Sequence, residues 1–318
     1  MTEEKNEKIL LIGAGTMAMD YAKVLKAMKK QFIVIGRGKK SAQDFEDTLG
    51  IPVEIGGINK WLENNQIIPD YAIVAVTGNQ LGKVCISLLR KKVTNILLEK
   101  PGGLNEDEIK SVANETDKYN ANVLLAYNRH FFASVIKAKE IIQEDGGVTS
   151  FNFEFTEWSH IVEKRDYDPE IKKFWLIHNS SHVIDLAFYL GGTPEKLECF
   201  TTGGFKWHPS STIFTGAGMT KENVPFSYHS NWDAPGRWGV EILTKNHRLI
   251  FRPLEKLQIQ KKASIAIEEV DIDYNLDTKF KPGLFKQVDA FLNKNWMEFI
   301  DIHQQLHHLK FYNMIANY

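Results

Sequence analysis

The chain has 318 residues, and its 39 Lys and Arg nearly balance its 40 Asp and Glu. This length suffices for two domains, and the balanced charge predicts no nucleic-acid partner and no attraction to an anionic membrane. Only two cysteines are present, so we expect neither a disulfide framework nor a cysteine metal site. A polar N-terminus and the lack of a bilayer-spanning apolar stretch predict a cytoplasmic protein.

The first apolar run, residues 8–12, predicts a buried parallel strand, and a glycine-rich turn follows it at once. Residues 13–18 read G-x-G-x-x-A and open a helix predicted from about residue 16 to 30. Gly13 permits the turn, and Gly15 lets the backbone approach a pyrophosphate. Because a helix N-terminus favours phosphate, we predict a dinucleotide site that also includes Thr16 and Met17.

The second predicted strand, residues 32–35, ends without the acidic residue that binds the ribose of NAD. Arg37 and Ser41 stand there instead. An arginine can stack on adenine and pair with a 2′-phosphate, so the sequence favours NADP(H) over NAD(H). Thr77 and Asn79 follow a strand at residues 71–76, where they could contact the ribose or the pyrophosphate.

The first 126 residues alternate short apolar runs with helical stretches. We expect further strands at 53–55, 95–98 and 123–126 and helices at 41–49, near 61–62, at 81–90 and at 105–119. This alternation predicts a doubly wound parallel sheet in a nucleotide-binding domain of residues 1–126, followed by a second domain of residues 127–318.

Charged and polar residues follow two of these strands. Glu99 and Lys100 precede Pro101, and Tyr127, Asn128 and Arg129 come after residues 123–126. The carboxyl ends of parallel strands border the crevice where open α/β sheets bind ligands, so both groups are candidates for the site.

With the glycine turn and these two motifs, essentially the whole chain resembles the Gfo/Idh/MocA oxidoreductases, the relatives of glucose–fructose oxidoreductase and inositol dehydrogenase. The resemblance implies an N-terminal Rossmann domain and a C-terminal α/β domain with a large, mostly antiparallel open sheet. It implies hydride transfer between a nicotinamide and a carbon of a sugar, sugar nucleotide or cyclitol. It also implies a homodimer or homotetramer formed through the C-terminal sheet. We expect cofactor contacts at Glu99 and Lys100, and contact of Arg129 with the cofactor or the substrate.

The second half begins with a predicted helix at 133–143 and a strand at 148–158, where three phenylalanines alternate with polar residues. Further strands are expected at about 197–205, 212–219, 226–232, 238–243, 248–251 and 257–260. Two closing helices are expected at 284–292 and 297–315, and we leave open whether they pack on the second domain or back on the first.

His178, His182 and Asp185 would share one face of a helix. The corresponding family stripe is Asp, His and Asp, so His182 matches the catalytic histidine and His178 replaces the first Asp. Three interpretations remain open: Lys100 and His182 transfer the proton and stabilise the oxyanion, the triplet binds a metal, or both histidines are structural. We favour the first and expect no metal.

Other aromatic and polar residues are candidates for substrate contacts, since flat rings suit sugars and arginine suits phosphate or carboxylate. They are Tyr127, Asn128, Trp158, His160, Arg165, Trp175, His178 and Asp185. The prediction is therefore an NADP(H)-dependent oxidoreductase acting on a sugar-type substrate. The alternatives are a non-enzymatic regulatory protein that binds dinucleotide and sugar, which the departure at His178 keeps open, and an enzyme of another reduction, like the biliverdin reductases of similar architecture.

Overall fold

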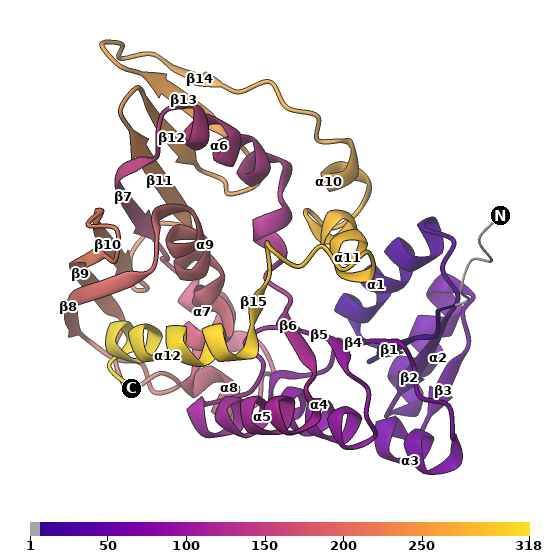
Figure 1. Ribbon diagram of the computed structural model, residues 1–318. Coiled ribbons are helices and arrows are strands. Elements are labelled where there is room, and N and C mark those ends of the chain that lie inside the picture. Colours follow the sequence, from indigo (N-terminus) through magenta and orange to yellow (C-terminus); the bar gives the residue numbers. More distant parts are fainter. Residues whose placement is uncertain (1–6) are drawn as a thin grey trace. The chain divides into compact units, whose positions relative to one another are not determined.

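The computed structural model describes residues 7–318, which form two compact units (Figure 1). The first unit comprises the chain up to Asn128 together with Leu276–Leu306. The second comprises Arg129–Asn275 and His307–Tyr318. Residues 276–306, which the sequence analysis assigned to the second domain, thus lie in the first unit.

The first unit contains a 7-stranded sheet in the order β15-β6-β5-β4-β1-β2-β3. Its strands are β1 (Ile9–Ile12), β2 (Phe32–Gly36), β3 (Val53–Ile55), β4 (Tyr71–Val74), β5 (Asn95–Leu98), β6 (Asn122–Leu125) and β15 (Ile300–Asp301). All neighbours pair in parallel except β15, which runs antiparallel to β6. The predicted doubly wound parallel sheet is confirmed, and its strand order reverses at β1, which lies between β2 and β4.

The helices of the first unit are α1 (Thr16–Ala27), α2 (Lys39–Leu49), α3 (Gly57–Asn64), α4 (Leu81–Arg90), α5 (Glu106–Tyr119), α10 (Asn275–Lys279), α11 (Leu284–Leu292) and the first turns of α12 (Ile302–Ala316). Most of these helices lie close to the predicted positions, but α10 was not predicted and the start of α12 differs. The prediction that α1 extends to residue 30 is wrong, because Lys29 adopts a φ of 54°, outside the helical range.

The last helix was predicted from residue 297 but begins at Ile302, after the short strand β15. Asp301 caps it, since its Oδ1 accepts hydrogen bonds from the backbone N–H of His303 at 2.9 Å and of Gln304 at 2.8 Å. The side chain of Gln304 accepts in return from the N–H of Asp301 at 2.9 Å. This reciprocal capping box was present in the sequence and marks the true start of the helix.

Helix α11 belongs to the first unit because its side chains pack on α1 and on the sheet. The Tyr71 hydroxyl of β4 donates to the Leu292 carbonyl at 3.1 Å, and the rings of Tyr71 and Phe291 meet edge to face at 5.4 Å. Phe291 is fully buried. Contacts between residues this far apart in the sequence leave no local pattern that could predict them.

The second unit contains an 8-stranded sheet in the order β14-β13-β12-β11-β7-β10-β9-β8. Its strands are β7 (Val148–Glu154), β8 (Pro194–Thr202), β9 (Ile213–Thr220), β10 (Pro225–Asn231), β11 (Gly239–Thr244), β12 (His247–Phe251), β13 (Gln258–Lys261) and β14 (Ile267–Glu269). Only β7 and β10 pair in parallel, which confirms the predicted mostly antiparallel sheet.

Strand β7 ends at Glu154, so its predicted extension to residue 158 is wrong. Other bonds replace the sheet ladder there. The indole N–H of Trp232 donates to the Phe155 carbonyl at 3.3 Å, and the Thr156 hydroxyl accepts from the N–H of Asn231 at 3.3 Å. Phe155 and Trp232 are both almost fully buried, so the chain leaves the sheet by turning into the core.

The helices of the second unit are α6 (Ala133–Glu144), α7 (Ser159–Lys164), α8 (Pro169–Lys173), α9 (Ser181–Gly191) and the last turns of α12, with a π-helical turn, η3 (Leu176–Ser180), directly before α9. Helix α9 covers the sheet through Phe188, whose ring packs edge to face on Phe151, Phe153 and Phe226. The short helices α7 and α8 and the strand β14 were not predicted. Among residues 7–318, no helix has both the length and the apolar character that crossing a bilayer requires.

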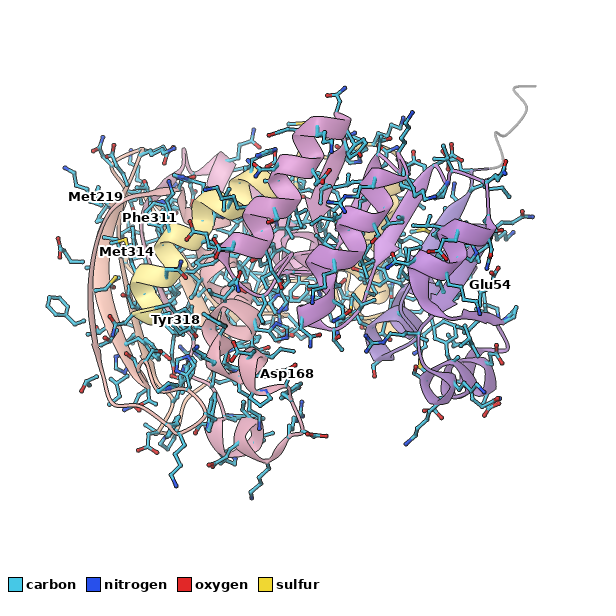
Figure 2. All side chains as sticks on the ribbon, turned by 90° about the horizontal axis from the view of Figure 1, so that it is seen from below. Glu54, Asp168, Met219, Phe311, Met314 and Tyr318 are labelled. Carbon is cyan, nitrogen blue, oxygen red and sulfur yellow. The ribbon has the colours of Figure 1, made fainter. Side chains whose placement is uncertain are left out.

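Tyr318, which follows α12 (Figure 2), forms a hydrogen bond with His208 in the second unit. His208 Nδ1 lies 2.7 Å from the Ser211 carbonyl and Nε2 lies 2.6 Å from the Tyr318 hydroxyl. A carbonyl only accepts, so Nδ1 carries the hydrogen and Nε2 accepts from Tyr318. Burial lowers the pKa of His208 from 6.5 to about 4.

This depressed pKa predicts a loss of stability in acid. Below pH 6.5 the unfolded chain protonates at His208 while the folded chain does not, so stability falls until the folded pKa is reached. We expect His208 to account for a loss of about 2 kcal/mol between neutral pH and about pH 5. Urea unfolding of the wild type and of His208→Gln, at neutral pH and at about pH 5, measures this loss in the free energy of unfolding. An equal loss in the variant would contradict the prediction.

Candidate functional site

The first unit contains a cavity of about 650 Å³ at the carboxyl ends of β1, β2 and β4, where the strand order reverses. This is the place at which open α/β sheets bind ligands. Of the residues predicted to contact a dinucleotide, the following line it: Gly13, Gly15, Thr16, Met17, Arg37, Ser41 and Thr77.

The two glycines of the turn have different surroundings. Gly13 has a φ of +127°, and a Cβ there would lie 2.1 Å from the Ala75 carbonyl oxygen. A Cβ on Gly15 would have no atom within 4 Å, because Gly15 faces the open cavity at the start of α1. Gly13 is therefore required by the fold, whereas Gly15 leaves room for a ligand to approach the backbone.

The chemistry of the lining suits a dinucleotide. No side chain caps the N-terminus of α1, and its first turn carries no acidic residue, so its N–H groups can receive a diphosphate. Arg37 and Lys83 are charged residues of the lining, and no carboxylate is among the residues that line the cavity. The residues present therefore fit a phosphate-bearing dinucleotide.

Sequence reasoning missed part of this lining. The missed residues follow β3 or lie in α4, and they are Gly56, Gly57, Ile58, Asn59, Lys83, Val84 and Ser87. The glycine pair directly after the predicted strand 53–55 was a usable signal, since a positive φ at both glycines lets the chain turn at a carboxyl end.

Glu99 does not line this cavity, although it was predicted to contact the cofactor. Its Oε1 accepts a hydrogen bond from the hydroxyl of Tyr21 in α1 at 2.7 Å, and the amide oxygen of Gln287 lies 3.3 Å from the same hydroxyl. Burial raises the pKa of the Glu99 carboxyl above its usual value, and the Tyr21 hydrogen bond and the charge of Lys100 oppose that rise. Glu99 thus ties the end of β5 to α1.

Pro101, which follows Lys100, is held in place by Gln305 and Tyr127. The side-chain amide of Gln305 donates to the Pro101 carbonyl at 3.1 Å, and the Tyr127 hydroxyl lies 3.2 Å from Gln305 Oε1. Tyr127 and Gln305 are almost fully buried, so Tyr127 braces the turn that carries Lys100. Asn128, also predicted to contact substrate, donates to the Pro282 carbonyl at 2.9 Å.

In the second unit, η3 interrupts the helix on which three site residues were predicted. The N–H of Ser181 donates to the Leu176 carbonyl five residues earlier, so the regular spacing that would align His178, His182 and Asp185 is lost. Asp185 Oδ2 lies 2.6 Å from Nε2 of His130, and both residues are buried. The sequence analysis did not single out His130, although it directly follows the Tyr127–Arg129 motif.

Beside this turn, cationic and aromatic side chains gather around Trp238. The guanidinium groups of Arg129 and Arg237 lie 5.0 and 4.5 Å from the Trp238 ring, and Arg237 also lies 4.7 Å from the half-exposed Trp158 ring. Burial lowers the pKa of Arg129 to about 10. The rings of His182 and Trp238 are 6.3 Å apart. These side chains form a polar, aromatic surface next to His182.

The remaining predicted contacts do not line the dinucleotide cavity. Asn79 accepts from the Thr77 hydroxyl at 2.9 Å but does not line the cavity. Arg165 donates to the Tyr167 hydroxyl at 3.1 Å, and His160 is exposed. Trp175 is buried, with its ring 6.2 Å from that of His178.

The metal interpretation finds no support in the described part of the chain. No group of three or more His, Cys, Asp or Glu residues between 7 and 318 is arranged to hold a metal ion. The carboxylate of the predicted triplet, Asp185, is bonded to His130 instead.

Residues 7–127 match the sequence profile of the Gfo/Idh/MocA family, described as an oxidoreductase family with an NAD-binding Rossmann fold. This part of the chain is therefore similar to the nucleotide-binding domain of that family. In the structure it contains both the dinucleotide-type cavity and Lys100. No curated protein matches the chain.

Solved structures extend the likeness of fold to nearly the whole chain. One is an oxidoreductase from Desulfitobacterium hafniense assigned as NADPH-dependent, with a TM-score of 0.80 and 16% identity over 98% of this chain and 95% of that one. Another is a levoglucosan dehydrogenase in complex with NADH and L-sorbose, with a TM-score of 0.76 and 16% identity over 98% and 96%. A third is UDP-N-acetylglucosamine 3-dehydrogenase from Acidithiobacillus ferrooxidans, with a TM-score of 0.75 and 14% identity over 98% and 96%. At these identities the likeness establishes that the chain has the fold of those enzymes.

Proposed function

We propose that this oxidoreductase uses NADP(H) in preference to NAD(H) and transfers a hydride to or from a carbon of a sugar, sugar nucleotide or cyclitol. The observation that carries the proposal is the cavity of the first unit, with an uncapped helix N-terminus, Arg37 at the end of β2 and no carboxylate in its lining. When bound, the nicotinamide supplies or accepts the hydride.

The preference for NADP(H) rests on charge. The ribose of NAD is usually bound by an acidic residue at the end of the second strand, whereas this chain places Arg37 there and follows it with Ser41 in the first turn of α2. A guanidinium can pair with both oxygens of a 2′-phosphate. Of the similar structures, one is named as NADPH-dependent and another holds NADH.

Arg37→Ala tests this preference. We expect the dissociation constant for NADPH to rise about tenfold or more while that for NADH changes little, because only NADPH offers a phosphate to Arg37. Fluorescence titration with each dinucleotide measures both constants. Lys39→Ala is the matched control, since Lys39 is a neighbouring cation that does not line the cavity. If the binding of NADPH and NADH weakened equally, Arg37 would not be the residue that recognises the 2′-phosphate.

We assign to Lys100 the stabilisation of negative charge on the reacting oxygen and to His182 the transfer of its proton. Two observations support these roles. Lys100 lies in a turn braced through Glu99 and Pro101. His182 lies in the first turn of α9, with its ring 6.3 Å from that of Trp238.

A sugar-type substrate is supported by the surface next to His182 and by the names of similar structures, a levoglucosan dehydrogenase and a UDP-N-acetylglucosamine dehydrogenase. Exposed aromatic faces suit sugar rings, and Arg237, which is half exposed, suits a hydroxyl or an acidic group. Among the predicted substrate contacts, Trp158, His178 and Asp185 lie in the second unit, whereas Tyr127 and Asn128 lie in the first.

The direct test is to incubate the protein with NADPH and a panel of keto-sugars, or with NADP⁺ and the corresponding alcohols, and to follow nicotinamide absorbance. Turnover within one sugar class supports the proposal. Dinucleotide binding without turnover of any sugar, together with capture of a protein partner, would favour the regulatory alternative that His178 suggests.

We further propose that copies of the chain associate through the sheet of the second unit. Phe200 of β8 supports this, since its side chain is 67% exposed. Sedimentation of the wild type and of Phe200→Ser tests it. A cytoplasmic location stays a proposal, supported by two cysteines that are both free.

A further inference from the structure

Glu157, directly after β7, carries a buried carboxylate to which the proposed reaction gives no role. The residue is only 3% exposed. Its Oε1 accepts hydrogen bonds from the Ser180 hydroxyl at 2.6 Å and from the Asn179 amide at 2.9 Å, and its Oε2 accepts from the same amide at 3.1 Å. A carboxylate with this burial persists only because these donors replace the water it has lost.

Both donors belong to η3, the π-helical turn that directly precedes α9. In a regular α-helix, consecutive side chains diverge by about 100° and do not share one partner. Asn179 and Ser180 nevertheless reach the same carboxylate from consecutive positions at the end of the widened turn. Their contacts with Glu157 fix the rotation at which the chain enters α9, and His182 is the second residue of that helix.

The other end of η3 is also held. The N–H of Leu176 donates to the Tyr318 hydroxyl at 3.3 Å, and the rings of Phe174 and Tyr318 meet edge to face at 5.2 Å. The first residue of η3 is thus held by Tyr318, and its last two residues are held by Glu157. The path of the chain into α9 therefore depends on the contacts that Glu157 makes.

Glu157 also interacts with Arg237, one of the side chains gathered around Trp238. Arg237 Nη1 lies 3.9 Å from Glu157 Oε2, and its guanidinium lies between the rings of Trp158 and Trp238. One carboxylate thus links the turn that leads to His182 with the segment that carries Trp238.

We propose that Glu157 is a positioning residue, which holds η3 and thereby sets the position of the His182 imidazole. This inference rests on the proposed function of His182 as the proton-transfer group. Glu157 itself is enclosed by Asn179, Ser180 and Arg237 and acts through them.

Glu157→Gln is the first test, because it keeps the shape of the side chain and removes its charge. One acceptor becomes an amide N–H₂ that would face the Asn179 amide, so η3 loses a hydrogen bond. We expect kcat to fall about tenfold or more while the KM for NADPH stays within about twofold, because the dinucleotide cavity is unchanged. Glu154→Gln is the control, since Glu154 is the last residue of β7 and pairs with the exposed Arg252 at 2.9 Å.

Exchanging the two groups provides the rescue. In Glu157→Gln combined with Asn179→Asp, the amide and the carboxylate trade places, so the hydrogen bond between positions 157 and 179 can form again. We expect the double variant to recover most of the lost kcat. Should Glu157→Gln fail to fold, Ser180→Ala removes a single hydrogen bond and is expected to lower kcat about threefold.

A readout without turnover separates this proposal from the proposed function. The imidazole NMR signal of His182 and its pH titration are measured in the wild type, in Glu157→Gln and in the exchanged variant. A shifted titration in Glu157→Gln that returns in the exchanged variant supports positioning, even if the wild type reduces no sugar. An unchanged titration, or an unchanged kcat in a folded Glu157→Gln protein, overturns it.

Discussion

Lys100→Met is expected to lower turnover at least about a hundredfold while leaving the affinity for NADP(H) nearly unchanged. Methionine retains much of the aliphatic stem of lysine but removes the ammonium that would stabilise negative charge on the reacting oxygen. Lys100 is not among the residues that line the dinucleotide cavity, so the loss should fall on the chemical step. Fluorescence titration gives the affinity, and single-turnover kinetics give the rate.

We expect the fold to survive this change, because two hydrogen bonds that hold the turn are made by the residues on either side of Lys100. Glu99 is tied to Tyr21, and the Pro101 carbonyl is tied to Gln305. Lys110→Met is the control, since Lys110 lies on the exposed face of α5. A Lys100→Met protein that turned over at nearly the native rate would remove Lys100 from the reaction, and one that lost NADP(H) binding would make it a cofactor ligand.

The nucleotide cavity could be predicted from the sequence because parallel strands present their carboxyl ends at one edge. A residue that directly follows a strand in the sequence therefore also lies at that edge in space. Gly13, Arg37 and Thr77 each follow a different strand, and all three line the cavity. Gly56 and Lys83 were missed for a similar reason. The strand before Gly56 and the helix that contains Lys83 were both predicted, but the residues at the ends of these elements were not considered as ligand contacts.

The supporting residues could not be predicted, since their partners are far away in the sequence. Gln305 joins the Pro101 carbonyl across more than two hundred residues, and Gln287 approaches Tyr21 in α1 from α11. Glu157 was interpreted as a position in a long strand because the period-two pattern of the phenylalanines runs up to it. Only the burial of its carboxylate against η3 distinguishes it from a surface glutamate.

The two glycines of the turn should respond to the same substitution in different ways. Gly13→Ala is expected to destabilise the protein by about 3 kcal/mol or more, because its Cβ would lie too close to a backbone oxygen in a conformation that alanine rarely adopts. The oxygen belongs to Ala75, 2.1 Å from the added Cβ at a φ of +127°. It cannot easily move, since the N–H of Ala75 donates to the Ile12 carbonyl at 2.8 Å.

Gly15→Ala should change stability by no more than about 1 kcal/mol, because its φ of −91° suits alanine and its Cβ has no atom within 4 Å. Its methyl group would instead occupy the space through which a pyrophosphate reaches the start of α1. We expect the dissociation constants for NADPH and NADH to rise together, about tenfold or more, because both dinucleotides share the pyrophosphate. Chemical unfolding and fluorescence titration of both variants measure the contrast. Unchanged affinity in Gly15→Ala would mean that the dinucleotide does not approach this turn, since a methyl group facing the cavity must obstruct a ligand seated against the backbone.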